Sequence, residues 1–360
     1  MSGLRDPRVE ALARILVDYC LEVQPRWQVI VAAQVAARPL VEELSRHLGR
    51  RGAYVLPRIG FDGAAWASEA PEELLDHLPP LQLEVELGAD ARIMIGAPEN
   101  VRARSGLTPE RRTLLNRATR PVMEHSLSGA QPWVSCVYPT PALAQLAGTS
   151  LAAYEELVYG ACLLDWPAER ARLERLRARL EGAREVRIEG TGTDLALSVA
   201  ERPCIVDDGR LNMPGGELYW GPHEGSATGV ITFGEHPLAD PTDATPIRGA
   251  RLVLEGGAVV DATAEAGEAE LHARLATDVG ARRVGELGIG CNPGLTRVTN
   301  DVLFDEKVAG TVHVALGASI PATGGTNASA LHWDLAKDLR RGGRLRIDGT
   351  VIQENGRWVF

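Results

Sequence analysis

Five side chains that could bind a divalent metal are concentrated in one stretch near the end of the chain, from Gly285 to Asp334. They are two glutamates, two histidines and an aspartate, each set among glycines, asparagines, prolines or small apolar residues: Glu286, Glu306, His313, His332 and Asp334. Imidazole and carboxylate groups together are ligands that Zn, Co, Mn and Fe take in proteins. The stretch therefore indicates a site for a borderline divalent metal.

The tripeptide His332-Trp333-Asp334 places an imidazole and a carboxylate two positions apart. On an extended backbone, residues i and i+2 point to the same face, whereas on a helix they diverge by about 200°. Both side chains reach one metal cluster only from an extended segment, so we expect this tripeptide at a strand end or in a loop. A lone H-x-D pattern occurs by chance in many proteins, so the spacing indicates a metal site without establishing one.

A further carboxylate, Glu217, lies directly after a Pro-Gly-Gly turn in the run NMPGGE. Glycine carries no Cβ, so the backbone of this turn could approach a ligand closely. A hairpin glutamate that faces solvent has the same local sequence, and from the turn alone it is the more common outcome. The turn leaves both interpretations open.

The first half of the chain alternates between helical and strand patterns. We expect helices at residues 8–23, 38–51 and 109–124, the last with Thr108 as its N-cap, and further helices that begin at residues 142, 151 and 167. We expect strands at residues 28–33, 53–58, 83–87, 91–95 and 133–138. Strands separated by helices predict a parallel sheet with helices on its faces, so the expected fold class of this half is α/β.

From residue 185 onward the pattern changes to short strands joined by Gly-rich turns, as in EVRIEG, TDLALSV and GVITFG. We expect two helices among them, at residues 266–278 and 330–341, and Asp348-Gly349 predicts a type I′ hairpin turn. A chain of 360 residues is long for one hydrophobic core. We therefore expect an α/β N-terminal domain at residues 1–184 and a mixed α+β, metal-binding catalytic domain at residues 185–360.

Composition and charge exclude several classes of protein. The formal net charge is −10, whereas nucleic-acid binding needs clustered Lys and Arg, so we expect no nucleic-acid partner. No apolar run reaches the length of a membrane span, and the N-terminal segment lacks the apolar core of a signal peptide. The five cysteines form no C-x-x-C pair, which argues against a disulfide framework. We expect a soluble, cytoplasmic protein with no membrane partner.

Two long runs in the second half resemble the thermophilic-type metalloaminopeptidase family, also called the aminopeptidase T or aminopeptidase S group: DDGRLNMPGGELYWGPHEGSATGVI and GELGIGCNPGLTRVTNDVLFDEKVAGTVHVALGASIPATGGTNASALHWD. Two runs in the first half look like the same family: IGAPENVRARSGLTPER and WVSCVYPTPALAQLAGTSLAAYEELVYGACLLDW. The resemblance covers nearly the whole chain, and its motifs are long and similarly spaced.

The resemblance implies a homodimeric enzyme that removes N-terminal residues from small peptides with two divalent metal ions, Zn, Co or Mn. Matched position by position, the family's metal ligands fall on five residues of this chain, with Glu286 as the bridge: Glu217, Glu286, His313, His332 and Asp334. Two further glutamates, Glu306 and Glu224, match acidic positions of the family pattern. Each could be the general base or could orient a metal-bound histidine.

One position departs from the family pattern. The family has a tyrosine seven residues after the histidine that matches His313, where it helps to hold the tetrahedral intermediate, and this chain has Ile320 there. Loss of one such donor lowers a rate by about 10²–10³-fold. Either another group takes its place, or the activity is weak, or the chemistry differs.

Two other functions are compatible with this scaffold. Pyridinediol ring-cleaving dioxygenases resemble the family in fold but hold a single Fe(II) with two histidines and one carboxylate, a role that His313, His332 and Asp334 would suit. Such a site has no need of Glu217 and Glu286. A non-catalytic binding protein is the other alternative, and only Ile320 supports it. Metal content distinguishes the three functions.

Overall fold

The computed structural model describes residues 6–61, 64–234 and 246–360. The chain forms two compact units, the first made of Met1–Leu163 with Gly209–Pro214 and the second of Leu164–Asp208 with Gly215–Phe360. These units divide the chain before the helix α8 (Trp166–Arg179) rather than after it, and a short segment returns to the first unit. Independent folding of residues 1–184 and 185–360 stays a prediction.

The first unit is built on a parallel sheet with the strand order β2-β1-β3-β4-β8. Its strands are β1 (Gln28–Gln34), β2 (Tyr54–Gly60), β3 (Ala91–Gly96), β4 (Trp133–Val137) and the two-residue β8 (Asn212–Met213). The interior strand β1 carries the buried residues Val29, Ile30 and Val31, as a strand covered on both faces requires. The predicted parallel sheet is confirmed.

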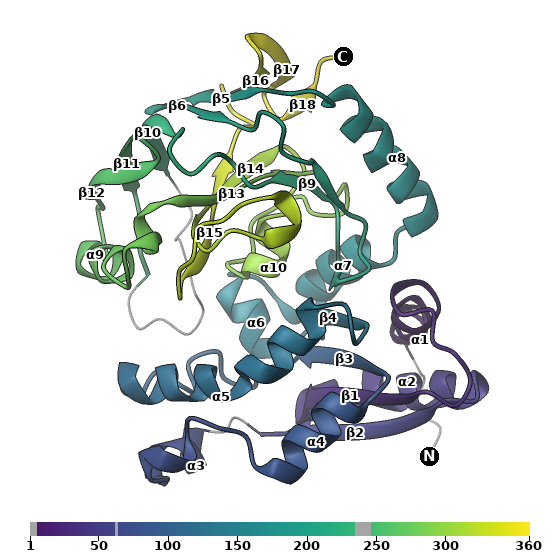
Figure 1. Ribbon diagram of the computed structural model, residues 1–360. Helices are drawn as coiled ribbons and strands as arrows, with labels where there is room; N and C mark the ends of the chain where they lie inside the picture. Colours follow the sequence, from purple (N-terminus) through teal and green to yellow (C-terminus); the bar gives the residue numbers. More distant parts are fainter. Residues whose placement is uncertain (1–5, 62–63, 235–245) are drawn as a thin grey trace. The chain divides into compact units, whose positions relative to one another are not determined.

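Helices connect the strands of the first unit, as Figure 1 shows. They are α1 (Pro7–Arg14) with a π-helical continuation η1 (Ile15–Cys20), α2 (Arg38–Arg50), α3 (Ala64–Glu69), α4 (Pro80–Gly88), α5 (Pro109–Leu127), α6 (Pro141–Leu146) and α7 (Leu151–Cys162), with the 3₁₀ turns η2 (Val35–Ala37) and η3 (Glu72–Leu74). Thr108 caps α5 as predicted, because its hydroxyl accepts a hydrogen bond from the backbone N–H of Arg111.

The predicted strand at residues 83–87 is wrong, because this segment belongs to the helix α4. The sequence LEVEL alternates apolar and charged residues, which imitates a strand. In the helix, the buried carboxylate of Glu86 forms ion pairs with Arg58 on β2 and Arg92 on β3. The ion pairs of Glu86 with these two strands favour the helical conformation, although the apolar alternation favours a strand.

The second unit contains two antiparallel sheets. Sheet B has eight strands in the order β12-β11-β10-β6-β5-β16-β17-β18, and sheet C has five in the order β15-β14-β13-β9-β7. Sheet B consists of β5 (Glu185–Gly190), β6 (Thr193–Ser198), β10 (Thr228–Phe233), β11 (Ala250–Glu255), β12 (Ala258–Thr263), β16 (Arg344–Ile347), β17 (Thr350–Glu354) and β18 (Arg357–Trp358). Sheet C consists of β7 (Ile205–Asp207), β9 (Glu217–Trp220), β13 (Val284–Gly290), β14 (Thr311–Gly317) and β15 (His332–Asp338).

Few helical segments accompany the two sheets in the described part of this unit. They are α8, α9 (Glu268–Leu275), α10 (Val302–Asp305), η4 (Gly280–Arg282) and η5 (Pro321–Thr323). The hairpin from β16 to β17 turns at Asp348 and Gly349, whose φ values of 48° and 80° fit the predicted type I′ turn. The second unit thus contributes antiparallel strands and the first unit a parallel sheet, which is the mixture that the sequence predicts.

The predicted helix at residues 330–341 is wrong, because strand β15 takes its place. This segment contains Ala, Leu and Lys, which favour helices. Its burial nonetheless alternates with the period of a strand, with Trp333 and Leu335 buried, and all seven residues pair with β14. Cross-strand pairing overrides the local propensity, and the His332-Trp333-Asp334 tripeptide is extended as predicted.

The two faces of sheet C have different environments. One face packs into the hydrophobic core of the unit, which also includes residues of sheet B: Leu218, Trp220, Leu287, Ile289, Val312, Val314, Leu316, Trp333 and Leu335. Figure 1 shows sheet B curving over the strands of sheet C. Because side chains alternate along a strand, the intervening residues of β9, β13, β14 and β15 all lie on the opposite face. We call this opposite face the site face.

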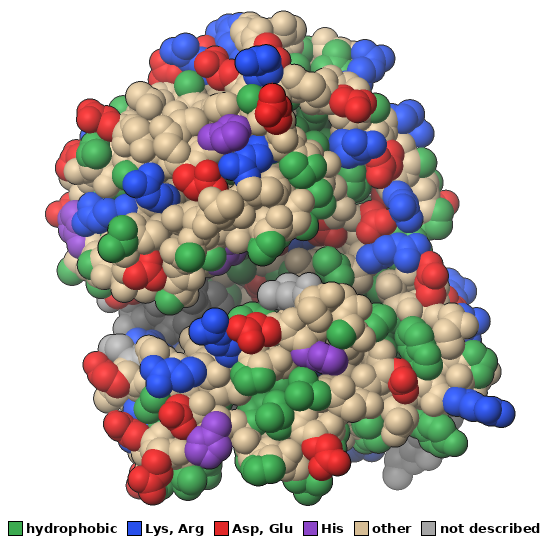
Figure 2. Space-filling view, in the orientation of Figure 1, with side chains coloured by type: hydrophobic (Ala, Val, Ile, Leu, Met, Phe, Trp, Pro, Cys, Tyr) green, Lys and Arg blue, Asp and Glu red, His purple; other side chains and the backbone are tan. Residues whose placement is uncertain are grey.

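Basic and acidic side chains are interspersed on the surface of each unit that Figure 2 shows. Among the described residues, no helix combines the length and the hydropathy that crossing a membrane requires.

Candidate metal centre

The site face of sheet C carries all five of the expected metal ligands. Glu217 begins β9, Glu286 lies on β13, His313 on β14, and His332 and Asp334 on β15. Cross-strand pairs fix their register: Gly290 pairs with Glu217, Gly288 with His313, Gly317 with His332, and Ala315 with both Glu286 and Asp334. Residues paired across antiparallel strands share a face, so the register brings the five side chains together.

Every expected ligand is paired with a glycine or an alanine, and this leaves space for the larger side chains to converge. At Gly288 an added Cβ would overlap the ring of His313, and at Gly290 it would overlap the carbonyl oxygen of Val308. Gly216 has a φ of +113°, and an added Cβ there would lie 2.8 Å from the Cβ of Asn292. The Pro-Gly-Gly sequence before Glu217 thus permits a close backbone approach to the neighbouring 291–292 turn.

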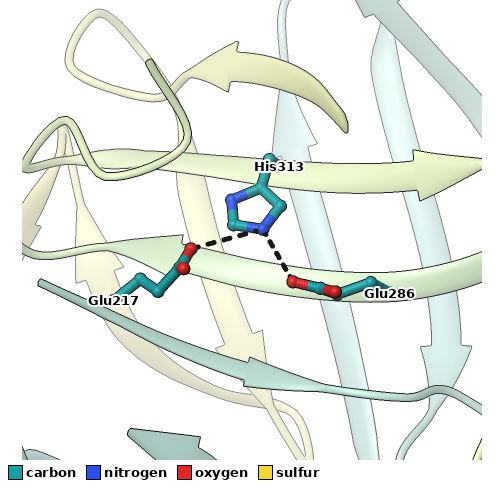
Figure 3. Close-up of side chains that lie close together, drawn as sticks. All are labelled: Glu217, Glu286 and His313. Carbon is teal, nitrogen blue, oxygen red and sulfur yellow. Dashed lines mark hydrogen bonds and ion pairs between the residues drawn. The ribbon is translucent and has the colours of Figure 1, made fainter. Parts of the chain in front are cut away.

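His313 lies at the centre of the cluster. Its Nε2 atom is 3.2 Å from Glu286 Oε1 and 3.5 Å from Glu217 Oε2, and Figure 3 shows the imidazole pointing toward both carboxylates. The same nitrogen lies 3.9 Å from Asp334 Oδ1. Glu217, Glu286 and His313 are all buried, and their ligand atoms are close enough to hold one metal ion.

A second group of ligand atoms is formed by His332, Asp334 and Glu286. His332 Nε2 is 3.5 Å from Asp334 Oδ2 and 3.8 Å from Glu286 Oε2. The ring of His332 is 36% exposed, whereas the Asp334 side chain is only 11% exposed. Glu286 belongs to both groups, with one oxygen facing each histidine.

Both histidines are oriented by hydrogen bonds to backbone carbonyls. His313 Nδ1 lies 3.1 Å from the carbonyl oxygen of Glu306, and His332 Nδ1 lies 2.8 Å from that of Ala318. Donation from Nδ1 leaves Nε2 of the neutral ring as the acceptor, directed at the carboxylates. Metal-bound histidines typically have this arrangement, in which the ring nitrogen that does not face the metal donates to a backbone carbonyl.

The donor set fits a divalent metal because buried oxygens lack other partners. Among the described residues, Glu217 Oε2, Glu286 Oε2 and Asp334 Oδ1 are buried and have no hydrogen-bond partner. Buried polar atoms are usually satisfied, and carboxylate oxygens next to imidazole nitrogen are ligands for zinc and similar ions. These three oxygens without partners therefore support a metal centre independently of the family resemblance.

Ionisation of the cluster reflects its surplus of negative charge. Burial opposes protonation of His313, but its hydrogen bond to Glu286 and the charge of Glu217 outweigh burial and raise the pKa of the imidazole to about 10. Burial raises the pKa of Asp334 to about 6, against the opposing effect of His332, and burial also raises the pKa of Glu217. Cations bound at these groups would displace the protons.

Lys307 and Asp207 extend the cluster and were not predicted. The Lys307 side chain is fully buried, with Nζ 3.4 Å from Glu217 Oε1 and 3.7 Å from Asp207 Oδ2, and it also contacts Glu306. Asp207 pairs with Glu217 across β7 and β9. The sequence gives one signal for Lys307, its place between Glu306 and the apolar run that leads into β14, whereas Asp207 in VDDGR has the composition of an ordinary turn.

The two candidate bases lie in different surroundings. Glu306 follows α10, is 14% exposed, and contacts Lys307, which also contacts Glu217. Glu224 accepts hydrogen bonds from the backbone N–H and the hydroxyl of Thr326 and forms an ion pair with Arg202. Burial acts to raise the pKa of Glu224, but the hydrogen bonds from Thr326 and the charge of Arg202 outweigh burial and lower this pKa. Among the described residues, no hydrogen bond or ion pair joins Glu224 to the five expected ligands.

Ile320 lies in the loop between β14 and η5 and is half-buried. Its carbonyl accepts hydrogen bonds from the backbone N–H and hydroxyl of Thr323, and its side chain offers no donor.

Comparisons with known proteins identify the family of the chain. The model of the family described as Thermophilic metalloprotease (M29) matches residues 5–358. Aminopeptidase T of Thermus thermophilus is 28% identical over 408 aligned residues, covering 98% of both chains. Aminopeptidase T of Thermus aquaticus is 27% identical, covering 97% of this chain and 98% of its own. Aminopeptidase 2 of Geobacillus stearothermophilus is 25% identical, covering 99% and 98%.

Solved structures give the same result for the fold. The structure of wild-type AmpT from Thermus thermophilus matches with a TM-score of 0.86 and 26% identity, covering 98% of this chain and 99% of that one. The structure of 2,5-dihydroxypyridine dioxygenase from Pseudomonas putida matches with a TM-score of 0.62 and 14% identity, covering 98% and 96%, which shows a shared fold alone. The chain therefore belongs to the thermophilic metalloprotease family (M29), among its metallo-aminopeptidases.

Proposed function

We propose that the protein is a dinuclear metal-dependent aminopeptidase that hydrolyses the N-terminal residue of small peptides, with Glu217, Glu286, His313, His332 and Asp334 as its metal ligands. The observation that carries the proposal is the position of Glu286. Its two oxygens face two histidines, 3.2 Å from His313 and 3.8 Å from His332, in two groups of potential ligands. A carboxylate shared in this way suits a bridge between two cations.

Charge balance supports two cations rather than one. Five carboxylates and one ammonium group are clustered here, a surplus of four negative charges while the imidazoles are neutral: Asp207, Glu217, Glu286, Glu306, Asp334 and Lys307. Buried charge is stable only when it is compensated. Two divalent cations, Zn, Co or Mn, would balance this surplus, whereas one would leave half of it.

Two bound cations would supply a water of lowered pKa and polarisation of the scissile carbonyl. The chain's own residues provide the remaining functions. Glu306 is the better candidate for the general base, because Lys307 fixes one of its oxygens while the other has no hydrogen-bond partner among the described residues. Glu306 would accept the proton of the attacking water and pass it to the leaving amine. The Glu224 carboxylate is held by Thr326 and Arg202, which suits a positioning role.

The alternative is a mononuclear Fe(II) ring-cleaving dioxygenase that uses His313, His332 and Asp334. The fold likeness to the Pseudomonas putida dioxygenase keeps this function in consideration. The buried carboxylates of Glu217 and Glu286 argue against it, because a single ion with three ligands leaves them uncompensated.

The test combines metal analysis with a panel of aminoacyl amides. The purified protein would be reconstituted with Zn, Co, Mn or Fe(II), and hydrolysis of each amide and metal content per chain would be measured. Two ions per chain with amide hydrolysis support the proposal. One iron per chain with no hydrolysis would favour the dioxygenase, and no bound metal would favour a binding protein.

We also propose that the protein acts as a homodimer in the cytoplasm on small peptides, as the family resemblance implies. Sedimentation at micromolar concentration tests the assembly, and a species of 38.7 kDa would refute it.

A further inference from the structure

Tyr219 is another polar residue on the site face of sheet C. Tyr219 follows Glu217 by two positions on β9 and pairs with Gly288, which pairs on its other side with His313. Tyr219 and His313 therefore flank the same glycine from adjacent strands. With no side chain at Gly288 between them, the phenol and the imidazole share one row across the sheet.

The neighbours of Tyr219 fix the direction of its side chain. Leu218 and Trp220, on either side of it in the sequence, are 0% and 1% exposed and belong to the hydrophobic core. Alternation along the strand then directs Tyr219 away from this core, toward the carboxylates. The ordinary pKa of a tyrosine phenol is about 10, so the hydroxyl keeps its proton at neutral pH.

The hydroxyl of Tyr219 is available for a ligand. Among the described residues, no hydrogen bond to this oxygen is formed, and the oxygen is not one of the buried unpaired polar atoms. The side chain is half-buried, so the ring is held by its surroundings while the hydroxyl reaches solvent. A half-buried ring with a free hydroxyl next to a metal-binding cluster is suited to donate one hydrogen bond in a fixed direction.

Such a donor would assist amide hydrolysis in addition to the polarisation that bound cations supply. As the water oxygen bonds to the carbonyl carbon, negative charge develops on the carbonyl oxygen, and a donor aimed at that oxygen stabilises the transition state. Ile320, which stands where the family pattern has a tyrosine, has no hydroxyl to donate. On the site face, the described strands offer Tyr219 as a neutral O–H donor beside Glu217 and Glu286.

We propose that the Tyr219 hydroxyl donates a hydrogen bond to the carbonyl oxygen of the scissile amide as it becomes an oxyanion, an inference that rests on the proposed aminopeptidase function. In this step the water oxygen bonds to the carbonyl carbon and its proton passes to Glu306. The carbon–nitrogen bond then breaks, and the proton moves from Glu306 to the leaving nitrogen. Tyr219 keeps its own proton throughout.

The test is the variant Tyr219→Phe, which keeps the ring and removes only the hydroxyl. In the two-metal protein, kcat for the best amide of the panel should fall by about 10²–10³-fold, with KM changed less than about threefold. A phosphonate analogue of the cleaved amino acid, whose tetrahedral anion imitates the intermediate, should bind about 10–100-fold more weakly. The free amino acid lacks the tetrahedral oxyanion, so its affinity should not change.

The matched control is Tyr54→Phe, which removes a phenol hydroxyl from a side chain that is 63% exposed on β2. Its kcat and phosphonate affinity should equal those of the wild type. Tyr219→Phe with wild-type kcat and phosphonate affinity would overturn the inference, and so would loss of bound metal, since the hydroxyl would then maintain the metal site. A wild-type protein that hydrolyses no amide would instead contradict the proposed function.

Discussion

The imidazole of His313 lies over Gly288, its cross-strand partner, in the space that a side chain at this position would fill. A methyl group on Gly288 would overlap the ring atoms Cε1 and Nε2. Nε2 is the atom that faces Glu217 and Glu286. The missing side chain on β13 therefore determines where the histidine of β14 can place its ligand atom.

Gly288→Ala should displace the imidazole of His313 and weaken metal binding by at least about 10–100-fold, the range found when the support of a metal ligand is lost. Zinc affinity measured by competition with a chelator tests this. The control is Gly49→Ala in α2, where an added Cβ meets no atom within 4 Å. It should leave zinc affinity unchanged and raise stability by about 0.5–1 kcal/mol. Wild-type affinity in Gly288→Ala would contradict the role of this glycine.

Glu286→Gln keeps the size of the side chain but removes the charge and one bridging oxygen. Because both groups of potential ligands include Glu286, the variant should lose at least one metal ion per chain and nearly all hydrolysis. Metal content by atomic emission and amide turnover would be measured, with folding followed by circular dichroism. Glu255→Gln, a change at an exposed residue of β11, is the control. Two metals and full turnover in Glu286→Gln would exclude the dinuclear assignment.

Glu306→Gln and Glu224→Gln should have different effects. If Glu306 transfers the proton, its replacement lowers kcat by about 10²–10⁴-fold while both metals are retained. Glu224→Gln retains the oxygen that accepts from Thr326 and loses the charge that pairs with Arg202, so kcat should stay within a few-fold of the wild type. Metal-loaded variants and steady-state kinetics provide the comparison. A larger loss in Glu224→Gln would reverse the assignment.

Lys307→Met should destabilise the metal-free protein by about 3–5 kcal/mol, because it leaves buried carboxylates without their cation. Bound metals would supply positive charge to the same cluster, so the loss should be smaller in the metal-loaded protein. Lys337→Met is the matched control, since this buried lysine donates to the carbonyl oxygen of Thr232 rather than to the cluster. Its effect on urea unfolding should not depend on metal. Equal metal dependence in the two variants would argue against a role for Lys307 in charge balance.

Metal affinity should rise with pH. In the metal-free protein the pKa of His313 is raised to about 10, so below that pH the imidazole must lose a proton before it binds a cation. Zinc affinity should therefore increase by about tenfold per pH unit between pH 7 and 9 for this one proton. The increase should be steeper below pH 6, where Asp334, with a pKa of about 6, is also protonated. Calorimetry in buffers of different ionisation enthalpy measures the protons released, and a pH-independent affinity would refute the prediction.

Local sequence predicted much of the fold because apolar spacing and capping residues act over short distances. Strands β1, β3 and β4, the N-cap Thr108 and the turn at Asp348-Gly349 are all of this kind. The errors at α4 and β15 have the opposite cause. In both segments, a contact with another part of the chain overrides the local pattern. In α4 the contact is the ion pair of Glu86 with Arg58, and in β15 it is the pairing of the strand with β14.

The family resemblance supplied the expected ligands, and the structure brings these five side chains together on one sheet face. Their spacing alone could not do so, because Glu217 and Asp334 lie on strands far apart in the sequence and meet only through the order β15-β14-β13-β9. Lys307 was missed for a related reason. A lysine is rarely fully buried unless a carboxylate pairs with it, and Asp207, which provides one of the carboxylates around Lys307, comes from a distant strand.

The burial of Lys307 has a consequence for chemical labelling. The sequence contains two lysines, Lys307 and Lys337, and both are buried. Every other cationic side chain outside the histidines is an arginine, which amine-directed reagents do not modify. Acylation of Lys307 would therefore mark opening of the carboxylate cluster, and acylation of Lys337 would mark separation from the Thr232 carbonyl of sheet B. Mass spectrometry of the two acylated peptides could thus follow the site and the core of the same unit separately.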